Sequence, residues 1–437
     1  MAREMKYSGY PWIGTIPFSW EVCRIKNLTS VYSGNSIKDE QKEFYEDPTD
    51  AVPYIATKDI DATLQTIDYK NGMYVKNADT SFKRADAQST LLCIEGGSAG
   101  RKIAYTEKDV CFVNKLCCFH SQTNSNKYIY YYLMSPAFTQ NFTSHISGLI
   151  GGVSVSEINN FEITLPSISE QNRIAEYLDK KCTEIDAMVK TTRSSIEEYK
   201  SLKLSVITRA VTKGLSTYCP MKDSGIDWIG DIPENWTVLR KLSYAVNKNI
   251  SYGIVKLFDP DDENGVKVLR CSDVREGRID TTNIRTVTQE VSNEYSRTVL
   301  GGGEVLINVR GTLGGCAVVP PEMKGYNIAR EVAMVSLSEQ ILNRYLMYYF
   351  LSRAFITYEE RHLAGSVYIG LNIEMLSACP VTLPPIEEQK QIAEYLDKTI
   401  GDINGLIAKK EKLLEELEQY KKTIIFEYVT GKKEVPA

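Results

Sequence analysis

The sequence predicts an α+β fold in which two mixed α/β globular domains are each followed by one long helix. The first observation is an internal repeat, because MKYSGYPWIGTIPFSW at residues 5–20 returns as MKDSGIDWIGDIPENW at residues 221–236. The second is a matching repeat, because LPSISEQNRIAEYLDK at 165–180 returns 218 residues later as LPPIEEQKQIAEYLDK at 383–398. Two long copies in one chain are expected to present two similar surfaces around an approximate twofold axis.

The repeat divides the chain into four large parts. A chain of 437 residues is too long for one ordinary domain. The part before each Leu-Pro is rich in Gly, Asn, Thr, Tyr and β-branched residues, with short apolar runs that are typical of strands and loops. We expect a first globular domain at 1–166, a first long helix at 167–214, a second globular domain at 215–384, a second long helix at 385–432, and a tail at 433–437.

Start and stop signals define the two helices. Ser167 precedes Glu170 by three residues, which is a capping-box pattern. In the other copy, Pro385 can occupy the first helical turn. Gly214 and Gly431 provide the stops. At about 1.5 Å per residue, a helix of this length is a rod of about 65 Å.

A heptad pattern runs through both predicted helices. In alternating steps of four and three, apolar residues hold seven of ten positions from Ile174 to Val206 and eight of ten from Ile392 to Ile424. This repetition is typical of a coiled-coil seam. A helix that packs only on its own domain is the alternative, but the equal register favours pairing of the two helices; the seam does not decide their direction. The predicted seam residues include Ile174, Leu178, Ile185, Tyr199, Leu202, Ile392, Leu396, Ile403, Leu413, Leu417 and Tyr420.

The distribution of charge is more informative than its sum. The net charge of −5 argues weakly against a nucleic-acid partner, because phosphate is bound by a local surface and not by the whole chain. Acidic residues gather in the predicted helices, as at Glu411 and Glu415, whereas basic residues such as Arg270 and Arg330 lie in the globular parts. Charge alone therefore suggests DNA binding only weakly.

Cysteine, histidine and apolar residues limit the class of protein. The ten cysteines include no C-x-x-C pair and the chain has three histidines, which argues against a zinc site and indicates reduced, buried thiols. The first residues have no apolar signal-peptide core, and no run of 18 apolar residues indicates a membrane span. We therefore expect a cytoplasmic protein with no membrane partner.

A glycine-rich segment in each copy raises the question of a serine nucleophile. Residues 96–100, Gly-Gly-Ser-Ala-Gly, match the nucleophile elbow G-x-S-x-G, which requires a strand–turn–helix and a nearby His and acid. The related segment at 310–315, Arg-Gly-Thr-Leu-Gly-Gly, keeps the glycines but has no serine. We therefore predict a glycine turn between two strands in each domain, which either is purely structural or contacts phosphate.

The repeated Trp-Ile-Gly-x-Ile-Pro-x-x-Trp segment is dense in aromatic residues. It spans Trp12–Trp20 and Trp228–Trp236. The favoured interpretation is a hydrophobic plug that seats the start of each copy against the core. A platform on which unpaired bases stack is the alternative.

Basic and polar residues near the turns are the candidates for contact with DNA. Arginine reads guanine through a bidentate contact in the major groove. For any one of these residues, solvated surface charge is the alternative interpretation. The candidates are Lys58, Gly97, Ser98, Arg101, Lys102 and Lys115 in the first domain, and Arg270, Arg275, Arg310, Thr312 and Arg330 in the second.

Enzyme signatures are otherwise missing from the sequence. It contains no G-x-x-x-x-G-K-[ST] loop for a nucleotide and no Asn-Pro-Pro-aromatic tetrapeptide for methylation of a base. Pro260-Asp261 with Glu322 and Lys324 resembles a nuclease site only faintly. We assign no catalytic and no metal-binding residue.

The order of the repeated parts carries a family resemblance. Two W-I-G-x-I-P-x-x-W segments open the globular domains, and two L-P-x-I-x-E-Q-x-x-I-A-x-Y-L-D segments open the long helices, which close with Ala210-Val211-Thr212 and Tyr428-Val429-Thr430. This arrangement resembles the DNA specificity (S) subunit of type I restriction-modification systems over nearly the whole chain.

The resemblance implies a non-enzymatic reader of DNA. In that family, two target recognition domains each bind one half of an asymmetric, bipartite sequence of double-stranded DNA. The two helices form an antiparallel coiled coil that sets the gap between the halves and docks two modification (methyltransferase) subunits, to which restriction subunits can be added. S-adenosylmethionine, Mg²⁺ and ATP would be used by those partners, and no cofactor would be bound by this chain.

Two other classes of function are kept as alternatives. One is a divergent DNA nuclease or methyltransferase, and the other is a purely structural interaction protein whose coiled coil serves assembly. The two globular domains match each other poorly, as expected of readers of different sequences. This difference prevents the transfer of contact residues from the family, and the sequence does not reveal the bases that are read.

Overall fold

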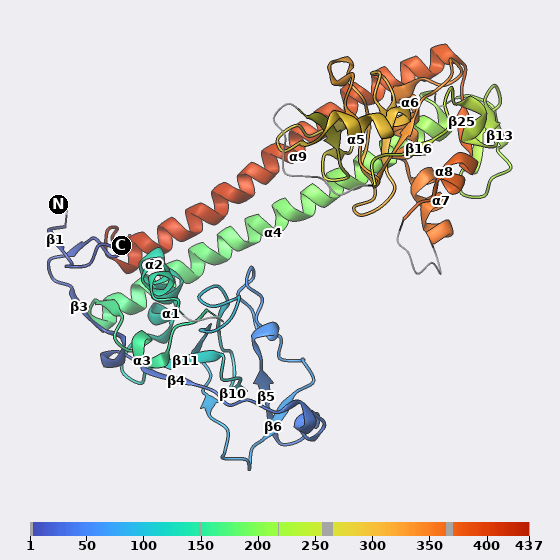
Figure 1. Ribbon diagram of the computed structural model, residues 1–437. Coiled ribbons are helices and arrows are strands. Elements are labelled where there is room, and N and C mark those ends of the chain that lie inside the picture. Colours follow the sequence, from blue (N-terminus) through green and yellow to red (C-terminus); the bar gives the residue numbers. More distant parts are fainter. Residues whose placement is uncertain (1–2, 148–150, 217, 256–264, 364–369, 437) are drawn as a thin grey trace. The chain divides into compact units, whose positions relative to one another are not determined.

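The computed structural model describes residues 3–147, 151–216, 218–255, 265–363 and 370–436. The chain forms two compact units (Figure 1). Unit 1 contains residues 1–193 and 411–437, and unit 2 contains residues 194–410. Each unit therefore holds one globular domain together with a segment of each long helix.

The globular domain of unit 1 contains two four-stranded sheets, in the orders β4-β11-β8-β9 and β6-β5-β10-β7. Two further strand pairs, β1-β2 and β3-β12, complete it. The strands are β1 Met5–Tyr7, β2 Thr15–Pro17, β3 Glu21–Arg24, β4 Ser30–Ser33, β5 Ala51–Ile55, β6 Tyr74–Lys76, β7 Arg84–Ala85, β8 Thr90–Cys93, β9 Ile103–Tyr105, β10 Val110–Phe112, β11 Leu116–His120 and β12 Glu162–Leu165. The helices are η1 Ile25–Asn27, η2 Asp39–Tyr45, η3 Thr57–Asp59, α1 Asn126–Met134, α2 Pro136–Ser144 and α3 Val155–Ile158.

The domain of unit 2 repeats most of this topology, but its second sheet has three strands and it contains an additional strand pair. Its main sheets have the orders β16-β24-β21-β22 and β20-β17-β23, and the strand pairs are β13-β14, β15-β25 and β18-β19. The strands are β13 Met221–Asp223, β14 Asp231–Pro233, β15 Thr237–Leu239, β16 Ser251–Tyr252, β17 Val266–Leu269, β18 Val274–Arg275, β19 Arg278–Ile279, β20 Arg285–Val287, β21 Val305–Asn308, β22 Cys316–Val318, β23 Asn327–Ile328, β24 Val332–Val335 and β25 Val381–Leu383. The helices are η4 Leu242–Ala245, α5 Gln289–Glu294, η5 Ser296–Thr298, η6 Pro321–Met323, α6 Asn343–Phe350, α7 Arg353–Leu363 and α8 Ile373–Ala378.

The two domains share unusual backbone features as well as strand order. β5 pairs in parallel with β10, and β17 pairs in parallel with β23, within otherwise antiparallel sheets. Gly34 and Gly253 lie at equivalent points, where a Cβ atom would collide with the backbone carbonyls of Phe112 and Ile328. A common scaffold therefore survives where the two sequences have diverged, which confirms the predicted pair of mixed α/β domains.

The second tryptophan of the repeated aromatic segment is buried in both domains. Trp20 and Trp236 are 1% and 0% exposed, and Ile16 and Ile232 beside them are each 1% exposed. These side chains belong to the largest apolar core of their own unit. Because buried rings offer no face to an incoming base, Trp20 and Trp236 act as a hydrophobic plug, whereas Trp12 and Trp228 are only half-buried.

The long helices begin and end close to the predicted residues. Helix α4 spans Ile168–Lys213 and helix α9 spans Ile386–Val429. Gly214 and Gly431, one and two residues beyond these helices, have positive φ angles of 74° and 69°, the conformation of a C-terminal stop. Among the described residues, no helix combines the length and the apolar composition that a membrane crossing requires.

The predicted capping box of α4 forms only in part. The backbone N–H of Glu170 lies 3.4 Å from Ser167 Oγ, as the pattern requires. The Glu170 carboxylate, however, accepts hydrogen bonds from Trp20 Nε1 at 2.9 Å and from Arg3 Nη2 at 2.6 Å. The start of the helix is therefore attached to the aromatic segment and not closed on itself.

The buried residues of each helix match the predicted seam at every second position. At the positions between, the buried residue is the one that follows the predicted residue in the sequence. Ile174, Leu178 and Ile185 of α4, and Ile392, Leu396 and Ile403 of α9, are buried as predicted. Tyr199 and Leu417 are half-buried against the cores of their units. Leu202, Leu413 and Tyr420 are 48%, 42% and 52% exposed, so their assignment to the seam is wrong. Their places are taken by the residues that follow them, Lys203, Leu414 and Lys421, which are half-buried.

Contacts within unit 1 show that the two helices run in opposite directions there. In unit 1, the rings of Tyr177 and Tyr428 are 4.6 Å apart, Asp186 pairs with Lys421 at 2.8 Å, and Arg193 pairs with Glu418 at 3.0 Å. Residue numbers therefore rise along α4 as they fall along α9. In unit 2, Lys410 Nζ lies 5.8 Å from the ring centre of Tyr199.

Each helix ends in the domain of the other repeat. The carbonyl of Val429, at the end of α9, accepts a hydrogen bond from Thr164 Oγ1 at 2.6 Å and lies 3.0 Å from the Tyr128 hydroxyl. The carbonyl of Val211, in the last turn of α4, has the same partners from the second domain, Thr382 Oγ1 at 2.6 Å and Tyr345 Oη at 3.1 Å. The last carbonyls of a helix have no partner within the helix, so these bonds fix both helix ends.

Helix α7 of the second domain carries a buried carboxyl group. Glu359 on α7 is 8% exposed. Burial, and secondly the charge of Glu360, raises the pKa of Glu359 to about 7. Burial, and secondly the charge of Glu359, raises the pKa values of the thiols of Cys316 and Cys379.

Replacing Glu359 by Gln should remove part of the pH dependence of stability. A carboxyl whose pKa is raised by folding contributes stability below its unfolded value of 4.5 and loses that contribution as the pH rises through about 7. We expect Glu359→Gln to gain about 1–3 kcal/mol over the native chain between pH 5 and pH 7.5. Urea unfolding at both pH values measures this difference, and the exposed Glu374→Gln is the control. An equal response of both variants to pH would contradict the assignment.

Candidate nucleic-acid interface

The glycine segments form turns between antiparallel strands. Residues 96–100 connect β8 to β9, and residues 311–315 connect β21 to β22. Gly96 and Gly100 have φ angles of 84° and 71°, a conformation that glycine adopts without strain. The predicted strand–turn–strand is confirmed, and because no helix follows Ser98 in this turn, the nucleophile elbow is excluded.

Two lysines of the first domain lie where the glycine turn meets helix η3. Lys58 is exposed on η3. Lys102, directly after the turn, donates from Nζ to the carbonyl of Thr57 at 2.7 Å. The structure therefore brings Lys58 and Lys102 together, although one side chain is engaged in attaching the turn to η3.

The remaining candidates of the first domain flank the same turn. Arg101 folds back and donates from its guanidinium to the carbonyl of Gly97. Lys115 is exposed, and its carbonyl accepts from the N–H of Ile94 at 3.0 Å, just before the turn. Ser98 is half-exposed at the centre of the turn. The six candidates of this domain thus gather at one end of the β4-β11-β8-β9 sheet.

Arg270 of the second domain is committed to the protein itself. Its guanidinium donates to both carboxylate oxygens of Asp273, at 3.1 Å each, and to the carbonyl of Asn283 at 2.6 Å. Asp273 is 4% exposed, and a buried carboxylate requires such a partner. Arg270 therefore holds a turn in place and is not free to read a base.

The other basic candidates of the second domain lie around Glu331. Arg310 is exposed, its N–H donates to the carbonyl of Glu331, and its guanidinium carbon lies 5.2 Å from the ring centre of Tyr252. Arg330 is exposed, with Nε 3.7 Å from the Glu331 carboxylate. Arg275 at the end of β18 and Thr312 in the glycine turn are also exposed. These four side chains are available at the surface of the domain.

One equivalent position beside the glycine turn carries opposite charges in the two domains. The strand registers pair Thr90 with Phe119 and Val305 with Val335, so β8 and β21 correspond from these residues onward. Counting along both strands places Glu95 of the first domain where the second domain has Arg310. A shared scaffold therefore presents different chemistry at one equivalent position.

A buried asparagine organises the second domain's surface and was not found from the sequence. Asn308 is 1% exposed, and its Nδ2 lies 3.0 Å from the carbonyls of Cys271 and Thr312 and 3.2 Å from that of Val274. It therefore joins the Arg270–Asp273 turn to the glycine turn. Gly315 is packed against this amide, and a Cβ atom there would collide with it. The signal in the sequence was a lone polar residue in the apolar strand before the glycines.

The described residues show little that would support catalysis. They include no group of three or more His, Cys, Asp or Glu side chains arranged to hold a metal. Burial raises the pKa values of the thiols of Cys316 and Cys379 well above the ordinary range, which disfavours the reactive thiolate. Of the faint nuclease pattern, Pro260 and Asp261 lie outside the described residues.

Comparison with known sequences identifies relatives along most of the chain. The profile described as "Type I restriction modification DNA specificity domain" matches twice, at residues 17–198 and 247–419. The type I restriction enzyme MjaVIII specificity subunit of Methanocaldococcus jannaschii is 26% identical, over 95% of this chain and 93% of its own length. The EcoBI specificity subunit of Escherichia coli is 22% identical, over 91% of this chain and 84% of its own.

Solved structures show the same fold. A chain from a study of "complex assembly and conformational transition of the type I R-M system" superposes with a TM-score of 0.71 at 16% identity, covering 96% of this chain and 99% of that one. The HsdS subunit from Thermoanaerobacter tengcongensis gives a TM-score of 0.50 at 17% identity, covering 98% and 100%.

Removing the Asn308 amide should loosen the surface of the second domain. Asn308→Ala leaves buried carbonyls without their donor, so we expect a loss of about 2–3 kcal/mol in the free energy of unfolding. Urea denaturation measures this loss. The exposed Asn283→Ala is the matched control and should change stability by less than about 0.5 kcal/mol. An Asn308→Ala variant as stable as this control would show that the amide does not organise the turns.

Proposed function

The chain belongs to the family of type I restriction-modification DNA specificity proteins, and from this premise we propose that each globular domain reads one half of a bipartite DNA sequence. One observation carries the proposal: the four-stranded sheets that carry the glycine turns share strand order and register, yet their equivalent turns present different side chains. A common scaffold with different surfaces suits a target whose two halves differ. The chain acts as the specificity subunit and leaves catalysis to its partners.

The surface around each glycine turn is the proposed contact with DNA. In the first domain, Lys58 and Lys115 are exposed and contribute positive charge, and the backbone amides of the turn can approach a phosphate. In the second domain, Arg275, Arg310 and Arg330 are exposed, and arginine is the side chain that best reads guanine in the major groove. Arg270 is removed from this set because Asp273 holds it.

The helix pair is the proposed ruler between the two half-sites. Contacts join α4 and α9 within each unit, and those of unit 1 are antiparallel. We infer that the pairing continues along both helices as a coiled coil, because the buried positions follow heptad spacing in both. The number of turns in this coiled coil then sets the number of unread base pairs.

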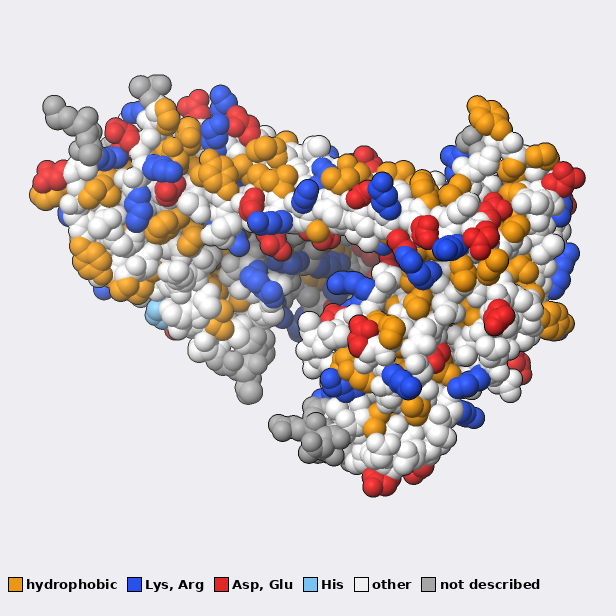
Figure 2. All heavy atoms as spheres, turned by 90° about the horizontal axis from the view of Figure 1, so that it is seen from above, with side chains coloured by type: hydrophobic (Ala, Val, Ile, Leu, Met, Phe, Trp, Pro, Cys, Tyr) orange, Lys and Arg blue, Asp and Glu red, His pale blue; other side chains and the backbone are white. Residues whose placement is uncertain are grey.

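An exposed apolar stripe beside the seam is the proposed dock for modification subunits. Leu406, Leu413 and Tyr420 recur every seven residues on one face of α9 and are 41%, 42% and 52% exposed. Met188 and Leu202 on α4 are 47% and 48% exposed, and each is the counterpart of Leu406 or Tyr420 in the first repeat. On the face shown in Figure 2, exposed hydrophobic side chains lie among basic and acidic ones. Two equivalent stripes suit two copies of one partner.

The partners would supply the chemistry. Methyl transfer and cleavage need S-adenosylmethionine, Mg²⁺ and ATP, which we assign to the modification and restriction subunits. We place the assembly in the cytoplasm, where cellular DNA is accessible. Turnover of DNA by the purified chain alone would contradict this division of labour.

Shortening both helices by one heptad tests the ruler. Deleting residues 192–198 from α4 and 410–416 from α9 removes about 10 Å from each helix. This length equals about three base pairs at ~3.4 Å each, so the unread gap should shorten by about three. Genome-wide methylation mapping of cells that carry the complex measures the gap. An unchanged gap, with both half-sites intact, would contradict the proposal that helix length sets the gap.

A charge in the apolar stripe should weaken docking. Leu413→Glu places a carboxylate where an apolar side chain of the partner would pack, so we expect at least about tenfold weaker assembly with modification subunits. Native mass spectrometry of the assembled complex gives both the affinity and the number of subunits. Gln419→Glu, on a different and exposed part of α9, controls for the added charge. Equal losses for both variants would remove the stripe as a dock.

A further inference from the structure

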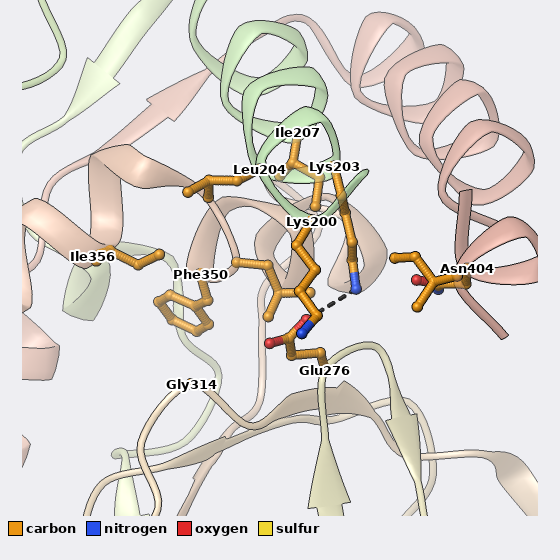
Figure 3. Close-up of a pocket in the computed structure, with 11 residues that line it drawn as sticks. Lys200, Lys203, Leu204, Ile207, Glu276, Gly314, Phe350, Ile356 and Asn404 are labelled. Carbon is orange, nitrogen blue, oxygen red and sulfur yellow. Dashed lines mark hydrogen bonds and ion pairs between the residues drawn. The ribbon is translucent and has the colours of Figure 1, made fainter. Parts of the chain in front are cut away.

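Lys203 of α4 forms an ion pair with the second domain. Its Nζ lies 2.9 Å from Glu276 Oε2, and its side chain is only 15% exposed (Figure 3). Glu276 occupies the turn between β18 and β19, directly after Arg275. The lysine belongs to the helix that follows the first domain in sequence, yet it contacts the second.

Lys421 of α9 occupies the equivalent position, 218 residues later. Its Nζ lies 2.8 Å from both carboxylate oxygens of Asp186 and 3.3 Å from Oε1 of Gln65, in the loop after η3 of the first domain. The side chain is 13% exposed. Each long helix therefore carries one largely buried lysine at its seam that reaches the domain of the other repeat.

A cavity adjoins each lysine at equivalent positions. The cavity in unit 2 has a volume of about 380 Å³ and the one in unit 1 about 280 Å³. Lys203, Ile207 and Ile407 line the first, and residues 218 positions away, Lys421, Ile425 and Val189, line the second. Because the space around each lysine is not filled by side chains, its polar contacts are important in fixing the domain against the helix.

The contacted hairpin carries a proposed DNA-reading residue. The N–H of Gly277 donates to the carbonyl of Cys316 at 2.8 Å, which connects the hairpin to the strand after the glycine turn. Gly314 of that turn lines the same cavity (Figure 3). A shift of Glu276 therefore moves Arg275 and the glycine turn together.

We propose that Lys203 is a positioning residue for the half-site read by the second domain, and Lys421 for the half-site read by the first. Each domain is thus positioned by a lysine of the helix that follows the other domain in the sequence. This inference rests on the proposed reading of half-sites, and it makes a prediction that a purely structural role does not: loss of one lysine relaxes recognition of one half-site only.

Reversing the charge of each lysine in the complete complex tests whether that lysine positions the domain of the other repeat. Methylation is measured on DNA duplexes that carry single substitutions in either half-site. Lys203→Glu should lower discrimination in the second domain's half-site by about fivefold, the scale of one partly exposed ion pair, and leave the other half-site unchanged. Adding Glu276→Lys should restore discrimination, and Lys421→Glu should affect the opposite half-site.

Two control variants and a second measurement separate the possible outcomes. Lys190→Glu on the exposed surface of α4 should change neither half-site, and Lys203→Met keeps the packing of the stem if the reversed charge prevents folding. Equal relaxation of both half-sites, or no rescue by Glu276→Lys, overturns the proposal. Hydrogen exchange of the β18–β19 amides should quicken in Lys203→Glu. If the native complex shows no bipartite specificity, the proposed function is wrong. The hydrogen-exchange measurement then still shows whether Lys203 holds the hairpin.

Discussion

The exchange of helix ends between the two repeats is the constraint on which the rest of the structure depends. The carbonyls of Val429 and Val211 would have no partner within their own helices, and each is satisfied by a threonine and a tyrosine of the other repeat's domain. A domain is therefore complete only when both helices are present, and this requirement explains why each compact unit contains segments of both. It also explains why the aromatic segment is repeated, since Pro17 and Trp20 pack against Gly431 and Pro233 and Trp236 against Gly214.

Much of the fold follows from the sequence because its signals are local or repeated. The helix ends were marked by a glycine and by the residues after a Leu-Pro, and the glycine turns lay between short apolar runs. The exact seam could not be predicted. Two neighbouring rows of residues on α9 are equally apolar, and either could form the seam. One row contains Ile400, Ile407 and Leu414, and the other contains Leu406, Leu413 and Tyr420. Only packing against the globular domain decides which row is buried, and that packing is not local.

For the candidate site too, the sequence indicates which residues lie near the glycine turns, but only tertiary contacts determine which of their side chains are free to contact DNA. Basic residues beside glycine turns were found from the sequence because such turns interrupt apolar strands. The difference between Arg270 and Arg310 is not visible in the sequence. It depends on the contacts of Arg270 with Asp273 and Asn283, and on the contact of Arg310 with the half-buried ring of Tyr252. Asn308 was missed for the opposite reason: its partners are backbone carbonyls, which any sequence supplies.

The contacts between each domain and the helix of the other repeat give a physical reason why the two domains can diverge in sequence preference and still remain attached to the helices. The helix ends are fixed to each domain by backbone carbonyls, a threonine and a tyrosine, none of which belongs to the turn that carries Glu95 in one domain and Arg310 in the other. Substitutions at the turn therefore leave the helix contacts intact. Lys203 is the exception, because Glu276 belongs to the hairpin beside the reading surface. A change of sequence preference in the second domain that alters this hairpin must therefore retain an acceptor for Lys203.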